Sequence, residues 1–151
     1  MRIAVFGAVA LATAIAISAD NPARIYLYAR RGTAARSWLS ISCGGVVVAE
    51  LKQGMFFAIN VAPGQATLFV ENGVPLSVIG HSGEELFIRL DWSYGIDRPP
   101  IPILSKVQQT EARREMKYLS YIGEKRVHSK LVPKTDPSEH LQPLLHTRDK
   151  Q

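Results

Sequence analysis

Residues 38–51 read WLSISCGGVVVAEL and predict a β-hairpin. In the first half, apolar residues alternate with serines and place Cys43 at the end of the apolar face, the period-two pattern of a half-buried strand. Gly44 and Gly45 follow, and glycine tolerates the positive φ angles that a two-residue hairpin turn requires. Residues 46–51 then form the returning strand.

Short strand-like runs separated by turn residues continue on both sides of this hairpin. The clearest turn is Pro63-Gly64, where proline presets φ and glycine accepts the positive φ of a type II turn. We predict seven strands, at residues 24–29, 38–43, 46–51, 55–61, 65–70, 74–79 and 84–91. Short strands at this spacing favour an antiparallel β-sandwich or a small barrel, and we predict the sandwich.

The region after these strands has a different character. Residues 95–102 contain four prolines or glycines and predict a loop. Residues 106–122 predict a helix, with Thr110-Glu111 near its start and Gly123 as its end. Its apolar stripe, which we expect to pack on the sheet, consists of Ala112, Met116, Leu119 and Ile122. Strands and helix together form a predicted domain over residues 23–122, and prolines among polar residues predict a flexible basic tail over 123–151.

The first 19 residues predict a secretory signal peptide. Arg2 precedes an uncharged apolar run over residues 3–17, and small residues, Ser18 and Ala19, stand before the first acid. These are the three regions of a cleavable leader, with cleavage near Ser18-Ala19. We therefore expect a periplasmic or secreted protein.

The start of the chain allows two other interpretations. The opening through Gly7 is similar to the first strand and turn of a dinucleotide-binding domain, but the further glycines of that fingerprint are missing. A retained membrane anchor stays open, although the apolar run is shorter than the about 20 residues that a span needs.

The net charge of +5 is unevenly distributed. Residues 20–105 carry seven basic and seven acidic side chains, whereas residues 106–151 carry ten basic and six acidic ones. The C-terminal third can therefore make electrostatic contact with anionic surfaces. We predict no nucleic-acid binding, because the basic residues near Arg113-Arg114 are interrupted by glutamates, as on a solvated helix face.

Catalytic groupings are sparse in this sequence. A hydrolase needs a nucleophile and a base within hydrogen-bond reach, and the one candidate grouping that only folding could assemble is Cys43 with His81, with Glu84 beside it. Cys43 also fits a packed thiol on an inward strand position. The four histidines show no paired spacing for zinc, so we predict no metal and no cofactor.

Five segments in order resemble a known bacterial family. They are residues 23–28 (ARIYLY), 47–51 (VVAEL), 52–57 (KQGMFF), 61–64 (VAPG) and 83–89 (GEELFIR). Together they resemble the family called "domain of unknown function 2846", over roughly residues 23–120. The resemblance implies a signal segment followed by a compact β-domain similar to small sandwich modules of cell-envelope proteins. It implies no activity, and no functional residues can be transferred from it.

These patterns favour an exported, non-enzymatic module of the cell envelope that binds an unknown protein or glycan partner. The alternative is a hydrolase around Cys43 and His81. The sequence indicates neither the identity of the partner nor the oligomeric state.

The leader yields the first testable expectation. We expect the intact mass of the protein from fractionated cells to correspond to a chain that begins at Ala19 or Asp20 and is found in the periplasmic or secreted fraction. Full-length protein in the cytosol would contradict export.

Overall fold

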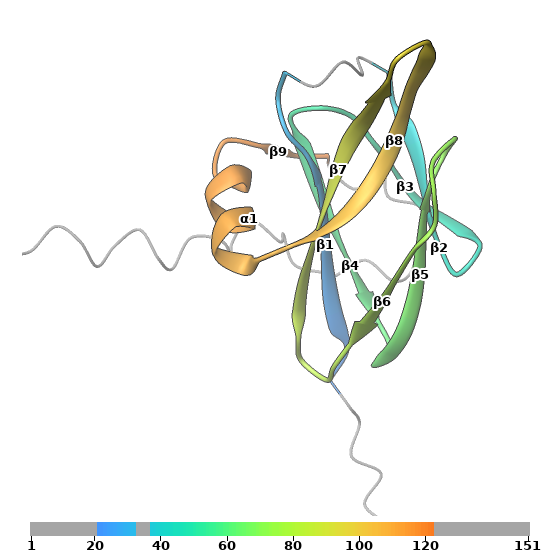
Figure 1. Ribbon diagram of the computed structural model, residues 1–151. Helices are drawn as coiled ribbons and strands as arrows, with labels where there is room; N and C mark the ends of the chain where they lie inside the picture. Colours follow the sequence, from blue (N-terminus) through green and yellow to red (C-terminus); the bar gives the residue numbers. More distant parts are fainter. Residues whose placement is uncertain (1–20, 33–36, 123–151) are drawn as a thin grey trace, which may run out of the picture.

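Two β-sheets pack face to face, and one short helix covers the outer face of the larger sheet (Figure 1). The structure, a computed structural model, describes residues 21–32 and 37–122. The predicted leader (1–19) and basic tail (123–151) lie outside the described residues. The predicted fold class, a β-sandwich with one helix, is confirmed.

The larger sheet has the strand order β8-β7-β1-β4-β9. Its strands are β1 (Ala23–Ala29), β4 (Met55–Val61), β7 (Glu85–Gly95), β8 (Arg98–Val107) and β9 (Ser120–Tyr121). Strand β1 runs antiparallel to β4 but parallel to β7, and β4 runs parallel to β9. These two parallel pairings differ from the antiparallel arrangement expected from the sequence. In the first pair, the chain returns beside β1 after passing through the other sheet as β5 and β6. In the second, it reaches β4 after crossing the outer face of the larger sheet as helix α1.

The smaller sheet has the order β3-β2-β5-β6 and is antiparallel throughout. Its strands are β2 (Leu39–Cys43), β3 (Val46–Leu51), β5 (Gly64–Val70) and β6 (Leu76–Gly80). The predicted β2–β3 hairpin is present, and both turn glycines have positive φ, 58° at Gly44 and 82° at Gly45. The seven predicted strands correspond to β1–β7, with identical bounds for β3 and β4.

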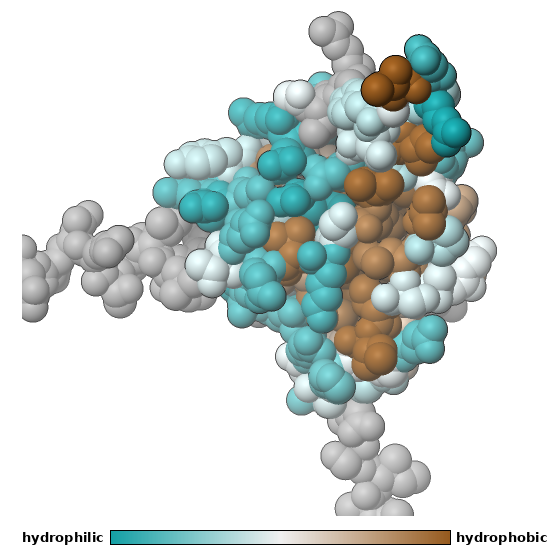
Figure 2. All heavy atoms as spheres, in the orientation of Figure 1, coloured by the Kyte–Doolittle hydropathy of each residue, from teal (hydrophilic) through white to brown (hydrophobic). Residues whose placement is uncertain are grey.

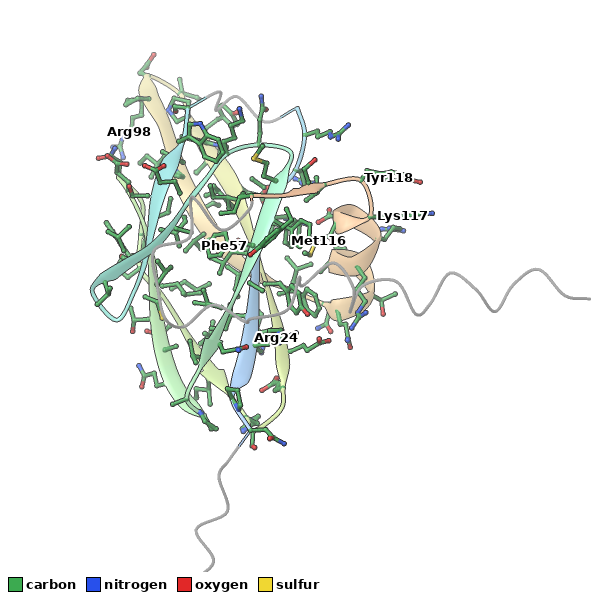
Figure 3. The ribbon with its side chains drawn as sticks, turned by 180° about the vertical axis from the view of Figure 1, so that it is seen from behind. Arg24, Phe57, Arg98, Met116, Lys117 and Tyr118 are labelled. Carbon is green, nitrogen blue, oxygen red and sulfur yellow. The ribbon has the colours of Figure 1, made fainter. Side chains whose placement is uncertain are left out.

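The sandwich contains two apolar layers. The main core lies between the sheets, and its fully buried members include Ile25, Leu27 and Phe57. A second cluster lies between the larger sheet and the helix and is formed by Tyr26, Tyr28, Phe56, Ala58, Phe87, Ala112 and Met116. Figure 3 shows Phe57 inside the sandwich and Met116 pointing from the helix toward the sheet. The larger sheet is therefore covered on both faces.

The loop predicted over residues 95–102 is wrong. The chain turns at residues 96–97, where Asp97 has a φ of 65°, and returns as β8 alongside β7. Prolines were the reason for predicting a loop, because proline cannot donate a ladder hydrogen bond. On an edge strand, however, proline nitrogens can face away from the neighbouring strand without loss.

The predicted helix is much shorter than residues 106–122. Helix α1 (Gln109–Met116) begins after Gln108, so Thr110 lies inside it instead of capping it. After Met116 the chain returns to the sheet, where the amides of Ser120 and Ile122 donate to Gly54 and Phe56. Ala112 and Met116 of the predicted stripe do pack on the sheet. No helix in the described part of the chain has the length and apolar character needed to cross a membrane.

Gly73 marks a close approach between the sheets and tests their packing. A Cβ atom there would lie 2.5 Å from the carbonyl oxygen of Pro102 and closer still to the side chain of Val70. We expect Gly73→Ala to lower the free energy of unfolding by about 1–3 kcal/mol, as overpacking does. Denaturant unfolding measures the change. Gly95→Ala is the matched control, since its Cβ meets only ordinary contacts with Arg98, and an equal loss in both variants would contradict the packing.

Candidate functional site

Cys43 is a packed thiol of the main core. It ends β2, is buried among the residues between the sheets, and forms no disulfide. Burial raises the pKa of the thiol, which keeps it protonated and poorly nucleophilic at neutral pH. The sequence-based interpretation of Cys43 as an inward-facing residue is confirmed.

His81 lies far from Cys43 along the sheet. Cys43 pairs with Leu68 of β5, whereas Gly80, the residue before His81, pairs with Gly64. Leu68 and Gly64 are four residues apart on β5, and this is about 14 Å at the rise of a strand. The structure thus does not bring the two side chains together.

Glu84 has a local role in the turn that contains His81. Its carboxylate accepts a hydrogen bond from the backbone amide of His81 at 2.8 Å. The next residue, Glu85, belongs to β7 and faces the helix. The two glutamates therefore act separately, one in the turn and one on the strand. No group of three His, Cys, Asp or Glu side chains that could hold a metal ion occurs within residues 21–32 and 37–122.

The densest group of charged side chains lies between helix α1 and the outer face of the larger sheet. We call it the helix-side ion cluster, and it consists of Tyr28, Arg30, Arg89, Asp91, Glu111 and Glu115. At its centre, the Arg89 guanidinium contacts Asp91 at 2.6 Å, Glu111 at 3.0 Å and Glu115 at 3.2 Å. Arg30 contacts Asp91 at 3.0 Å and Glu115 at 3.4 Å. Arg89 belongs to β7, Arg30 directly follows β1, and the helix supplies the two glutamates.

Tyr28 completes the cluster. Its hydroxyl donates to the Glu115 carboxylate at 2.5 Å. Burial, and then the hydrogen bond to and the charge of Glu115, raise the pKa of Tyr28 above its ordinary value. Burial lowers the pKa of Arg89, but its carboxylate partners outweigh that effect and raise it overall. The phenol therefore stays neutral and the guanidinium stays charged.

A second group of contacts surrounds Glu85 on the same face. Its carboxylate accepts from Tyr26 at 3.1 Å and from Gln109 at 3.3 Å, and it pairs with Arg113 at 2.7 Å. Arg113 also lies over the ring of Phe87, with its guanidinium carbon 5.8 Å from the centroid. Arg113 of the basic helix segment is thus engaged with the sheet, whereas Lys117 and Tyr118 point away from the sandwich (Figure 3).

These contacts attach the helix to strands β1 and β7, and their role is structural. Each of these carboxylates faces a guanidinium or phenol donor. Sequence reasoning missed the cluster, although two signals were present. Arg89 and Asp91 alternate on one face of a strand, and Glu111 and Glu115 are four residues apart on one helix face. What no pattern shows is that those two faces meet.

The exposed candidate for binding is the tip of the β7–β8 hairpin. Residues 93–101 are all exposed. The tip carries Tyr94, 64% exposed, and Ile96, 94% exposed. Figure 2 shows apolar side chains at this end of the molecule, and Figure 3 places Arg98 near the tip. An aromatic, an aliphatic and a cationic side chain are therefore presented together to solvent.

No protein-family model matches the chain. No curated protein and no solved structure matches it either. The resemblance to the "domain of unknown function 2846" family thus stays a prediction, and the candidate surfaces rest on the geometry alone.

The Tyr28–Glu115 hydrogen bond predicts that the stability of the protein depends on pH. A pKa raised by folding adds stability that is fully present below the unfolded pKa, about 10 for tyrosine, and is lost as pH rises toward the folded pKa. We expect Tyr28→Phe to be about 1.5–3 kcal/mol less stable than the natural protein at pH 7, because it loses a hydrogen bond to a charged group. Above about pH 10 the difference should narrow. Denaturant unfolding at several pH values measures it.

Tyr94→Phe is the matched control for loss of a phenol hydroxyl, because Tyr94 is exposed at the hairpin tip. We expect its stability at pH 7 to stay within about 0.5 kcal/mol of the natural protein. A difference between Tyr28→Phe and the natural protein that stays constant with pH would contradict the coupling to Glu115.

Proposed function

We propose that this chain is an exported, non-enzymatic module of the cell envelope that binds a partner, protein or glycan, through the tip of its β7–β8 hairpin. The observation that carries the proposal is the exposure of Ile96 and Tyr94 at the projecting tip of the hairpin (Figure 1). Export is supported by the signal-like residues 1–19.

The tip is suited to insertion into an apolar pocket. Burial of one isoleucine side chain contributes about 1.5–3 kcal/mol, and Ile96 is nearly fully available for it. The ladder from Phe87–Val107 to Ser93–Ile101 holds the hairpin in shape, so little conformational entropy is lost on binding. An aliphatic anchor flanked by Tyr94 and Arg98 favours a protein over a glycan, since tyrosine and arginine are the residues that protein interfaces enrich.

The charged groups beside helix α1 support a structural role instead of a binding role. In the helix-side ion cluster the arginines and carboxylates contact one another at 2.6–3.4 Å. Binding a charged ligand there would require those contacts to break, with loss of the attachment of α1. Binding a partner at the hairpin tip would not require any of these contacts to break.

Site-specific photo-crosslinking tests the proposed contact. A photoreactive residue at position 96 should capture one envelope component in living cells, and Ile96→Asp should reduce its binding about tenfold or more, as loss of a central anchor does. Val46→Asp is the matched control, because Val46 is another exposed aliphatic residue beside a hairpin turn. We expect it to bind as the natural protein does.

Two results would contradict the proposal. Capture of no envelope component from position 96 would remove the tip as a contact. Equal loss of binding in the Ile96→Asp and Val46→Asp variants would show a general effect of an added charge.

A further inference from the structure

Within the residues that the structure describes, strand β6 is a sheet edge with no proline, charge or bulge in its own span, although Pro75 stands directly before it. The other long edge strands of the sandwich differ from it. The edge strands of the larger sheet are β8 and β9, and those of the smaller sheet are β3 and β6. Edge strands present unpaired N–H and C=O groups that can pair with another chain, and proteins usually block them with proline, charge, bulges or cover. Strand β9 has two residues and adjoins the end of the described chain.

Strands β8 and β3 both carry such protection. Pro100 and Pro102 are two residues apart and thus face the same side of β8, which must be the side away from β7 because neither has an N–H to donate. The turn at Gly73 also lies against Pro102. Strand β3 has a register shift opposite Ile41 and Ser42, a bulge that interrupts its edge.

The free groups of β6 follow from the alternation along β5. The carbonyl of Thr67 accepts from Gly44 on the β2 side. Its neighbours Ala66 and Leu68 therefore face β6, where they pair with Val78 and Leu76. The N–H and C=O groups of Ser77 and Ile79 consequently point away from the sheet. Residues 76–80 contain no charge and no proline, and their ladder with β5 has no bulge.

Apolar side chains surround this free edge. Figure 2 shows them gathered in a strip over the side of the sandwich where β6 and β8 lie. Ile79 is 62% exposed, Val74 of the preceding turn is 61% exposed, and Ile101 of β8 is 39% exposed. A strand that pairs with β6 would cover part of this strip in addition to making backbone hydrogen bonds.

We propose that two copies of the chain pair through β6, antiparallel, about a twofold axis at Val78. In this register Ser77 lies opposite Ile79 of the second copy, and both residues have their free groups aimed at the partner. Each of the four free N–H groups then meets a free C=O group, and no charge opposes another. The two four-stranded sheets become one continuous sheet, and the contact is isologous, the commonest kind in homodimers.

A second copy fits this edge because residues 76–80 carry no charge and no proline and form a ladder without a bulge, so nothing in either copy opposes the pairing. The dimer also places Ile79 and Val74 of each copy near the neighbouring molecule, so that the exposed apolar side chains shield one another.

Sedimentation and light scattering of the protein purified as it occurs in cells test the proposal. We expect a dimer at high protein concentration that dissociates on dilution. Ser77→Pro removes one outward N–H without touching the β5 ladder, and Ile79→Lys places a charge on the edge. Each should weaken self-association about tenfold or more, as edge charges and prolines do. Val47→Lys is the matched control, since Val47 is an exposed valine on the opposite edge strand of the same sheet.

A paired substitution tests the register. In Ser77→Glu combined with Ile79→Lys, each introduced lysine faces an introduced glutamate of the second copy, so we expect the dimer to return and to weaken in high salt. Circular dichroism of every variant confirms that the fold is retained.

Three outcomes would overturn the proposal. They are a monomer at every concentration, a dimer that persists unchanged in both Ser77→Pro and Ile79→Lys, and a stoichiometric complex in which a different protein occupies β6. Recovery of the dimer in the paired variant alone supports the proposed register. Self-association is measured on the isolated protein, so its outcome does not depend on the partner proposed for the hairpin tip.

Discussion

Strand β1 has both faces buried, and the rest of the structure depends on this constraint. Ile25 and Leu27 point into the core between the sheets, whereas Tyr26 and Tyr28 point to the opposite face, and all four side chains have no exposed surface. A strand with no solvent-exposed face must be covered by other secondary structure on both sides. The second sheet supplies one layer, and helix α1 supplies the other. With eight residues, α1 is too short to be stable alone in water, so its packing on Tyr26, Tyr28 and Phe87 is what maintains it.

The polar groups of this face follow from the same constraint. The rings of Tyr26 and Tyr28 fill the layer under the helix, and their hydroxyls reach its rim, where they donate hydrogen bonds to Glu85 and Glu115. Partly buried carboxylates need cations, and Arg89 and Arg113 provide them. Much of the charge of the larger sheet is thus used to attach the helix. Exposed large apolar side chains stand elsewhere, among them Ile96 at the hairpin tip and Ile79 at the edge of β6.

Much of the architecture was predictable from local patterns. Alternation and turn glycines located β1 to β7, because a half-buried strand and a tight turn leave marks within a few residues. The same reasoning misassigned residues 95–107, because proline is read as a break unless the strand is known to be an edge. It also predicted too long a helix. The apolar spacing of Met116 continues through Leu119 and Ile122, but the chain leaves the helix after Met116 and returns to β4. The helix-side ion cluster could not be predicted as a site, because Arg89 and Glu115 meet only after two faces pack together.

By itself, the sequence determined the β-class of the domain, the position of its turns and the burial of Cys43, because each depends on residues next to one another. Tertiary structure alone decided which strands are neighbours, including the parallel pair β1–β7, and which strands become edges. It also decided that Cys43 and His81 lie apart, and that Ile96 and the free groups of Ser77 and Ile79 face solvent. The physical reason is that exposure and sheet order depend on contacts between distant segments, and these contacts exist only when the whole sandwich has formed.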